Sequence, residues 1–210
     1  MNEPFPKNPD SKLARYIDAL VEAIARHWLA LFNTIWGTYL LLPISAPILM
    51  EVGLTAPASL IYWVYSVLCH QLPDHSYFLF GQNPVPLLPH LESHGMATGL
   101  SLWEQRHFIG NDHLGFKTAI CQRDIAIYGS VLLTGLFFNG VRHRLLPLNF
   151  KLYILCLVPI AVDGITQLVG LHESNWWLRT LTGALFGSAS IWLAYPHVEA
   201  AMRETLIEPG

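Results

Sequence analysis

Long stretches without charge are the feature of this sequence that most limits what it can fold into. Only Glu51 carries a formal charge between His27 and Asp74, and no Asp, Glu, Lys or Arg lies between Arg179 and Glu199. A membrane-spanning helix needs about 20 mostly apolar residues, and its backbone must satisfy its own hydrogen bonds within the hydrocarbon. Because these runs are continuously apolar rather than alternating, they predict spanning helices and exclude a transmembrane β-barrel.

The composition excludes the other broad classes of protein. Charged residues make up only 13% of the chain, whereas soluble globular domains carry about 25%. A hydrophobic share of 52% with a net charge of -3 excludes a disordered chain. The 12 Lys and Arg residues against 15 Asp and Glu residues give no basic footprint for nucleic acid. We therefore expect a multi-pass protein of the cell membrane whose surroundings are the lipid bilayer.

The predicted fold is all-α: a polytopic bundle of about five transmembrane helices, preceded by an N-terminal amphipathic helix. The predicted spans are residues 28–50, 56–72, 119–138, 152–170 and 177–195. Three regions follow: an amphipathic segment at 1–27, a transmembrane domain at 28–195 with a long polar loop at 73–118, and a C-terminal tail at 196–210. The amphipathic helix either lies on the membrane surface or leads directly into the first span.

Polar residues gather at the ends of the predicted spans on one side of the membrane. With five spans, the loops after the second and the fourth span lie on the side of the N-terminus. The span ends that meet there contain four polar clusters, at 69–71, 121–124, 163–167 and 173–179. This convergence predicts a polar site at that membrane face.

Asp163 is the centre of the predicted catalytic group. It lies just past the middle of a hydrocarbon core about 30 Å thick, where a carboxylate is costly unless it is paired, hydrated or protonated. The candidate catalytic residues are Asp163, Gln167, Glu173, Arg123 and Arg179. Asp163 would act as a base, and one of the arginines would bind an anionic group. The structural alternative is a network of salt bridges and hydrogen bonds that holds two spans together.

Two cysteines supply the candidate metal ligands. Cys69, His70, Cys121 and Asp124 lie at the same face, and thiolate, imidazole and carboxylate together favour zinc as the cofactor. The sequence has no CxxC or HxxxH spacing, so two alternatives stay open. One is a disulfide between Cys69 and Cys121, if this face meets an oxidising compartment. The other is a pair of inert buried thiols.

Four ordered motifs carry a resemblance to a known family. They lie at Cys69–Pro73, Gly115–Gly129, Asp163–Gln167 and Glu173–Gly183. Together the motifs resemble the prokaryotic integral-membrane family catalogued as domain of unknown function 2085, over roughly residues 62–187. The resemblance implies a small helical membrane protein and brings no established activity. Members of that family often carry a second Cys where this chain has Asp124, and an Arg where it has His75.

Two classes of function are compatible with these residues, and the sequence does not decide between them. The first is a membrane enzyme that acts on a lipid-linked or amphiphilic substrate, with a metal or acid–base groups. The alternative is a non-enzymatic protein: a small transporter, or a subunit that binds a metal or a partner. The oligomeric state stays open. The short connection with Arg142, Arg144 and Lys151 favours the opposite face as the cytoplasmic one.

Overall fold

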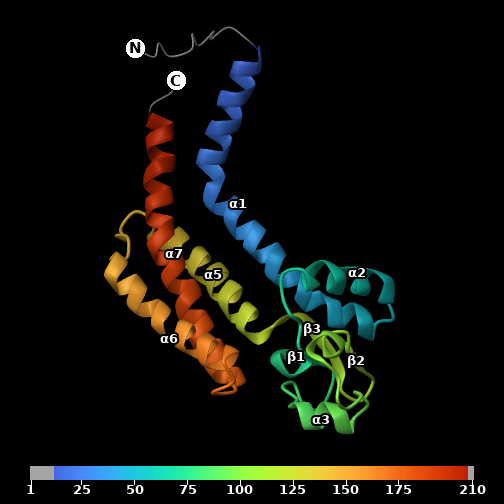
Figure 1. Cartoon of the computed structure of the whole chain (residues 1–210). Helices are drawn as coiled ribbons and strands as arrows, with labels where there is room; N and C mark the ends of the chain where they lie inside the picture. Colours follow the sequence, from blue (N-terminus) through green and yellow to red (C-terminus); the bar gives the residue numbers. More distant parts are fainter. Residues whose placement is uncertain (1–11, 208–210) are drawn as a thin grey trace, which may run out of the picture.

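The computed structural model describes residues 12–207 and shows a mostly helical protein with a small sheet (Figure 1). The helices are α1 (Lys12–Glu51), α2 (Thr55–Ser66), α3 (Leu88–Ser93), α4 (Leu102–Gln105), α5 (Gln122–Val141), α6 (Phe150–Leu168) and α7 (Trp176–Ile207), with a 3-10 turn η1 (Pro73–His75). The strands are β1 (Ser76–Leu79), β2 (Gly110–Asn111) and β3 (Gly115–Cys121), in the antiparallel order β1-β3-β2. The sheet corrects the all-α prediction.

Three helices of the described chain, α1, α5 and α6, are long and apolar enough to cross a membrane. The five predicted spans are therefore not confirmed. The predicted second span at 56–72 is wrong in its extent, because α2 has 12 residues and ends at Ser66. At about 1.5 Å per residue, such a helix covers roughly 18 Å, well short of a hydrocarbon core of about 30 Å. The predicted start of the third span is also wrong, because residues 119–121 belong to β3.

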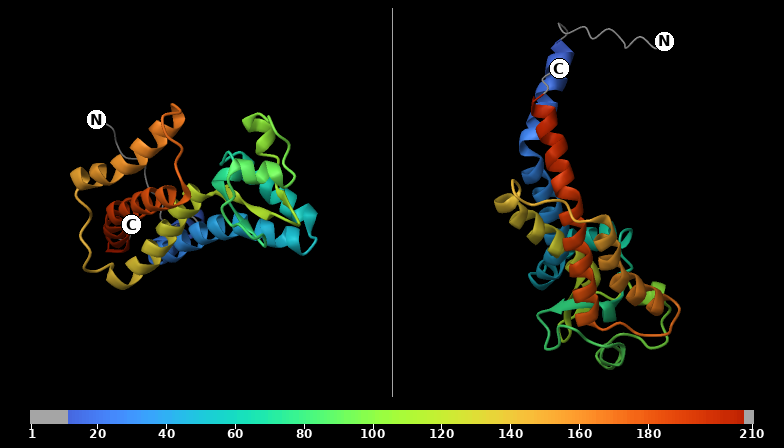
Figure 2. Two further views of the ribbon diagram at one scale, coloured as in Figure 1. Left: turned by 90° about the horizontal axis from the view of Figure 1, so that it is seen from below. Right: turned by 90° about the vertical axis from the view of Figure 1, so that its left-hand side faces the viewer.

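The helices α5 and α7 form the axis of the bundle (Figures 1 and 2). Gly183 and Gly187 of α7 allow the close approach, since a Cβ on Gly183 would lie 3.0 Å from the Arg123 carbonyl oxygen, and one on Gly187 would overlap Ile127. Packed beside α7, α6 buries only Asp163 and exposes an apolar face that includes Leu155. An exposed apolar face suits contact with lipid.

The two ends of the molecule differ. The start of α1 and the end of α7 project beyond the connection between α5 and α6, and we call this side of the molecule, with that connection, the terminal end. Residues 67–121 fold into the lobe at the other end, beside α2 and the end of α1 (Figure 1). The N-terminal part of α1 was predicted to share the side of the polar clusters. It lies at the opposite end, because α2 is too short to cross back.

The predicted polar loop at 73–118 is folded as part of the lobe. Its small core contains Phe78, Leu91, Met96 and Leu114. The close β1–β3 approach needs a glycine, because Gly115 has a φ of 74° and a Cβ there would overlap the Leu79 carbonyl. Ala119 and Ile120 of β3 pack in one buried cluster with α1 and α2. The lobe is thus fixed against the membrane helices.

The predicted terminal regions are helical where the structure describes them. Residues 12–27 continue without a break into the first span as part of α1, and residues 196–207 are the last turns of α7. The rest of the predicted amphipathic segment and tail, at 1–11 and 208–210, lies outside the described residues.

Candidate functional site

The site begins where β3 passes directly into α5. Cys121 is the last residue of the strand and the N-cap of the helix, and its Sγ accepts the Asp124 backbone N–H at 3.5 Å. The Cys121 backbone N–H in turn donates to Cys69 Sγ at 3.3 Å. The ligand atoms of Cys69, Cys121 and Asp124 all lie within 4.8 Å of one another. A single junction thus brings together three of the four predicted metal ligands.

Buried hydrogen bonds fix the segment that carries Cys69. Gln71 adopts a positive φ of 53°, and its side-chain amide donates to the carbonyls of Tyr62 at 2.9 Å and Ala119 at 2.8 Å. The fully buried Lys117 donates from Nζ to the Gln71 carbonyl at 2.6 Å. A residue in this left-handed conformation persists only where its surroundings hold it. These contacts therefore place the Cys69 thiol against β3.

The cluster has the donor atoms of a metal site with one open position. Catalytic zinc sites use three protein ligands and leave the fourth position to water or substrate. The hydrogen bond to Cys69, together with burial, raises the pKa of the Cys121 thiol. A bound cation would displace these thiol protons. His70 is exposed and does not join the three-residue cluster, although it lines the same pocket.

Two arginines lie beside the cluster, each held by a polar partner. Arg123 donates from Nη2 to Asp163 Oδ2 at 2.5 Å and to Gln167 Oε1 at 3.1 Å. Arg179 donates from Nη1 to Gln122 Oε1 at 3.2 Å. Asp163 and Arg179 are 4% and 5% exposed, so both charges are removed from solvent. Asp163 is therefore ion-paired with Arg123 of α5.

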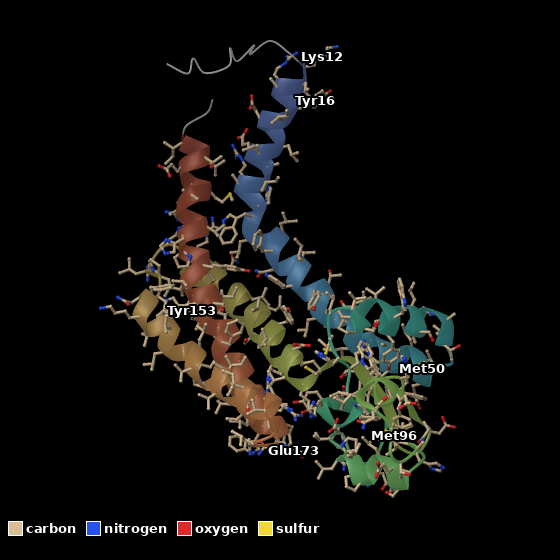
Figure 3. All side chains as sticks on the ribbon, in the orientation of Figure 1. Lys12, Tyr16, Met50, Met96, Tyr153 and Glu173 are labelled. Atoms are coloured by element: carbon tan, nitrogen blue, oxygen red, sulfur yellow. The ribbon has the colours of Figure 1, made fainter. Side chains whose placement is uncertain are left out.

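These groups open onto one pocket of about 700 Å³ between the lobe, α5, α6 and α7. The predicted residues that line it are Cys69, His70, Cys121, Arg123, Asp124, Gln167, Glu173 and Arg179. Asp163 does not line the pocket, and its carboxylate is paired with Arg123, which does. Figure 3 shows Glu173 near the lobe and Tyr153 at the far end of α6. The structure thus gathers the predicted residues at one end of the bundle.

The pocket also contains residues that were absent from the predicted catalytic and metal sets. His75 lies beside Gln167, with a distance of 3.4 Å between their Nε2 atoms. Burial lowers the pKa of His75 to about 4, although the nearby Asp74 opposes that effect, so the imidazole is neutral at pH 7. In the sequence, His75 is the position at which members of the family often carry an Arg. Its position two residues after the Cys69–Pro73 motif was the available signal.

Comparison with known proteins gives a family and no activity. The model of a family described as predicted membrane protein (DUF2085) matches residues 104–193, from α4 through most of α7. The chain is also similar to the uncharacterized protein MJ1492 of Methanocaldococcus jannaschii, with 30% identity over 139 residues, which cover 65% of this chain and 67% of the relative. No solved structure matches the chain. The protein therefore belongs to the DUF2085 family of predicted membrane proteins.

Proposed function

We propose that this protein is an integral membrane enzyme that uses a zinc ion to hydrolyse, or transfer a group from, an anionic amphiphilic substrate. The observation that carries this proposal is the shared pocket. The three-ligand cluster of Cys69, Cys121 and Asp124 and the arginine pair of Arg123 and Arg179 line the same cavity. That cavity lies at the ends of α5 and α6, two helices with the length and hydropathy of membrane spans.

The zinc ion would be held by the thiolates of Cys69 and Cys121 and the carboxylate of Asp124. A zinc ion with an open position lowers the pKa of a bound water and polarises a phosphoryl or carbonyl oxygen. The two backbone N–H groups that point at the sulfur atoms stabilise negative charge on them. The start of α5 adds the positive end of the helix dipole at Cys121.

The arginines would bind the anionic group of the substrate. Guanidinium groups recognise phosphate and carboxylate through paired donors. Asp163 holds Arg123 and Gln122 holds Arg179, so each arginine is fixed before the substrate arrives. We therefore assign Asp163 a positioning role through Arg123, in place of the direct role as a base.

The pocket, in this proposal, opens on the extracytoplasmic side of a multi-pass membrane protein in which α7 is a further span. Short segments rich in Lys and Arg stay in the cytoplasm. The described basic residues at the terminal end are Lys12, Arg15, Arg26, Arg142, Arg144, Lys151 and Arg203. Those at the lobe end are Arg106, Lys117, Arg123 and Arg179, which are mostly buried or lie in the pocket. The substrate would therefore come from the outer leaflet or from the external medium.

Metal analysis of the detergent-purified protein tests the zinc site. We expect about one zinc per chain in the wild type and a large loss in Cys121→Ser and Asp124→Asn. Cys156→Ser is the matched control, because this half-buried thiol lies within α6 and outside the cluster. Less than about one-tenth equivalent of zinc in protein whose thiols are reduced would exclude the metal. Loss of free thiols on purification would instead support the disulfide between Cys69 and Cys121.

Cleavage of intact cells tests the orientation. A protease site inserted after Gly99 lies in an exposed turn of the lobe with open space around it. External protease should cut this site in intact spheroplasts. The same insertion after Arg144, in the connection between α5 and α6, should be cut only after lysis. The reverse pattern would place the pocket in the cytoplasm.

Lipid turnover tests the enzyme itself. Wild-type protein incubated with total membrane lipid from its own expression host should convert one class of anionic lipid, detected by mass spectrometry of the extract. Cys121→Ser and Arg179→Gln should abolish the conversion, whereas Cys156→Ser should leave it unchanged. Identical lipid profiles with the wild type and with no protein would remove the enzymatic assignment in favour of the binding or transport alternative.

A further inference from the structure

A second pocket lies at the terminal end, remote from the candidate functional site. It has a volume of about 340 Å³ and is enclosed by α1, the start of the α5–α6 connection and the last turns of α7. Its polar lining comes from Arg26, His27, Arg142, Glu199 and Arg203. Because α5 ends at Val141 and α6 begins at Phe150, this pocket lies at the level where those two helices end.

A single buried carboxylate organises this second pocket. Glu199 is 4% exposed and accepts Trp28 Nε1–H at 3.0 Å and Arg203 Nε–H at 2.7 Å. Arg142 Nε lies 3.2 Å from the same carboxylate but has no hydrogen-bond partner within the described chain. One negative charge thus faces two guanidinium groups, and a positive charge remains in the pocket.

The other residues around the second pocket offset little of that positive charge. Arg26 is engaged by Glu22 on its own helix, and an Nη of Arg203 contacts His143 Nδ1. The remaining lining is apolar and includes Met202 and Leu206 of α7. A cationic centre with an apolar wall fits a ligand that has an anionic head and a hydrocarbon chain.

We propose that this pocket binds the phosphate of an anionic phospholipid headgroup. Basic pockets between membrane helices on the cytoplasmic side are suited to anionic headgroups, and the leaflet there is rich in such lipids. Arg142 and Arg203 bind the phosphate oxygens, and Glu199 holds both guanidinium groups toward the pocket. The acyl chains lie along the apolar side of α7. The site rests on the membrane orientation proposed above, but it is independent of the zinc cluster and of the reaction proposed there.

Native mass spectrometry of the full chain in a zwitterionic detergent tests this site. The probes are phosphatidylglycerol, phosphatidylcholine and inorganic phosphate. We expect phosphatidylglycerol to bind at least about tenfold more tightly than phosphatidylcholine, because the choline cation of the latter makes its headgroup zwitterionic and cancels the charge of the phosphate. Arg142→Gln and Arg203→Gln should each weaken phosphatidylglycerol binding by about tenfold, the effect of losing one charge-assisted hydrogen bond. Arg144→Gln is the control, since Arg144 is close in sequence but does not line the pocket.

The outcomes separate lipid from free phosphate. Equal binding of the two lipids, or unchanged binding in both arginine variants, would overturn the proposal. Displacement of phosphatidylglycerol by an equal concentration of inorganic phosphate would also overturn it, because the apolar wall would then contribute nothing. If a glutamine variant does not fold, Arg142→Lys and Arg203→Lys keep the charge and lose the paired donors. They should weaken binding less than tenfold, and no change in either of them would count against the site.

Discussion

Near each end of α5, an arginine pairs with a buried carboxylate of a neighbouring helix, but the two pairs differ. At its start, Arg123 reaches the buried Asp163 of α6. Just after its end, Arg142 reaches the buried Glu199 of α7. Asp163 uses Oδ2 for Arg123, while its Oδ1 is buried and has no partner among the described residues. Glu199 has both carboxylate oxygens engaged, by Trp28 on one and the arginines on the other.

This difference separates a carboxylate that mainly joins helices and orients arginines from one at a candidate catalytic site. A carboxylate with all its hydrogen bonds made and two cations around it joins helices and leaves a basic surface. A carboxylate with one unmatched oxygen, next to a cavity, is the kind of imperfect satisfaction that proteins retain at functional positions. Asp163 does not line this cavity, but the acidic residues Asp74, Asp124 and Glu173 do. The lobe end therefore has surplus negative groups, which the proposed zinc ion would offset for an anionic substrate, whereas the terminal end has surplus positive ones.

The largest expected effect comes from breaking the close contact between α5 and α7, the two helices that connect the lobe end to the terminal end. In Gly187→Val the new side chain would overlap the Ser130 hydroxyl and the Ile127 carbonyl, so the helices must move apart. We expect a loss of more than about 4 kcal/mol in the free energy of unfolding, measured by SDS-induced unfolding in mixed micelles. Gly140→Val is the control, because nothing lies within 4 Å of a Cβ at that position of α5. Similar losses in the two variants would show that close packing is not the cause.

Removal of the two carboxylates compares the ends directly. Asp163→Leu should cost about 3–5 kcal/mol, because it leaves a charged arginine in a mostly enclosed place. Glu199→Leu should cost less, about 1–3 kcal/mol, since its arginine side chains are 29% and 48% exposed and can turn to water. SDS-induced unfolding in mixed micelles measures the loss of stability in both variants. A greater loss of stability in Glu199→Leu than in Asp163→Leu would contradict this distinction between the two carboxylates.

A pH effect above neutral pH should arise at the lobe end. Burial lowers the pKa of Lys117 from 10.5 to about 7, while its Nζ donates to two carbonyls, of Gln71 and Arg106, which a neutral amine can also do. Between about pH 7 and pH 10.5 the amine is charged in the unfolded chain and neutral in the folded one. Unfolding then takes up a proton, so stability should rise with pH across this window and be independent of this group below it.

Thermal unfolding in detergent at pH 7 and pH 9 measures this slope. The wild type should gain stability over that interval relative to Lys117→Met, which has no amine to titrate. The variant also loses two hydrogen bonds, so the change with pH is compared and not the absolute midpoint. Equal slopes in the two proteins would mean that the buried amine stays protonated through this range.

The smallest effect is expected at a thiol that belongs to neither end. Cys156 lies within α6, partly buried, about two helical turns before Asp163, and it lines neither of the two pockets. Cys156→Ala should change the free energy of unfolding by less than about 1 kcal/mol and leave zinc content unchanged. A larger loss in the free energy of unfolding would show that the Cys156 side chain contributes to the packing of α6.

Much of the lobe-end site could be predicted, because the signals were local. Asp163 and Gln167 are one helical turn apart in α6, and Cys121 and Asp124 lie within the first turn of α5 and its cap. Charge inside an apolar run is easily recognised. The prediction that several helix ends converge followed from that pattern, and the pocket lining shows the same residues together.

The predictions that failed concern segments whose structure depends on contacts between residues distant in sequence. Residues 67–72 look like the end of a span, yet Gln71 leaves the helical conformation to reach Tyr62 and Ala119. The segment of β3 resembles the start of a helix in sequence, and its pairing with β1 and β2 makes it a strand. Glu199 fell within the predicted tail at 196–210, whereas α7 continues through Pro196 to Ile207. Because Glu199 was placed in a tail, the second pocket that it lines was not predicted.

The direct passage from β3 into α5 has a consequence for how this family can vary in length. Cys121 serves both elements, so the junction has no loop to absorb an added residue. One insertion there would turn α5 by about 100° relative to the sheet. Arg123 would then point away from Asp163, and Gly183 would no longer face the Arg123 carbonyl. Natural variation in chain length should therefore collect in the lobe turns and at the α5–α6 connection, and be absent between residues 119 and 124.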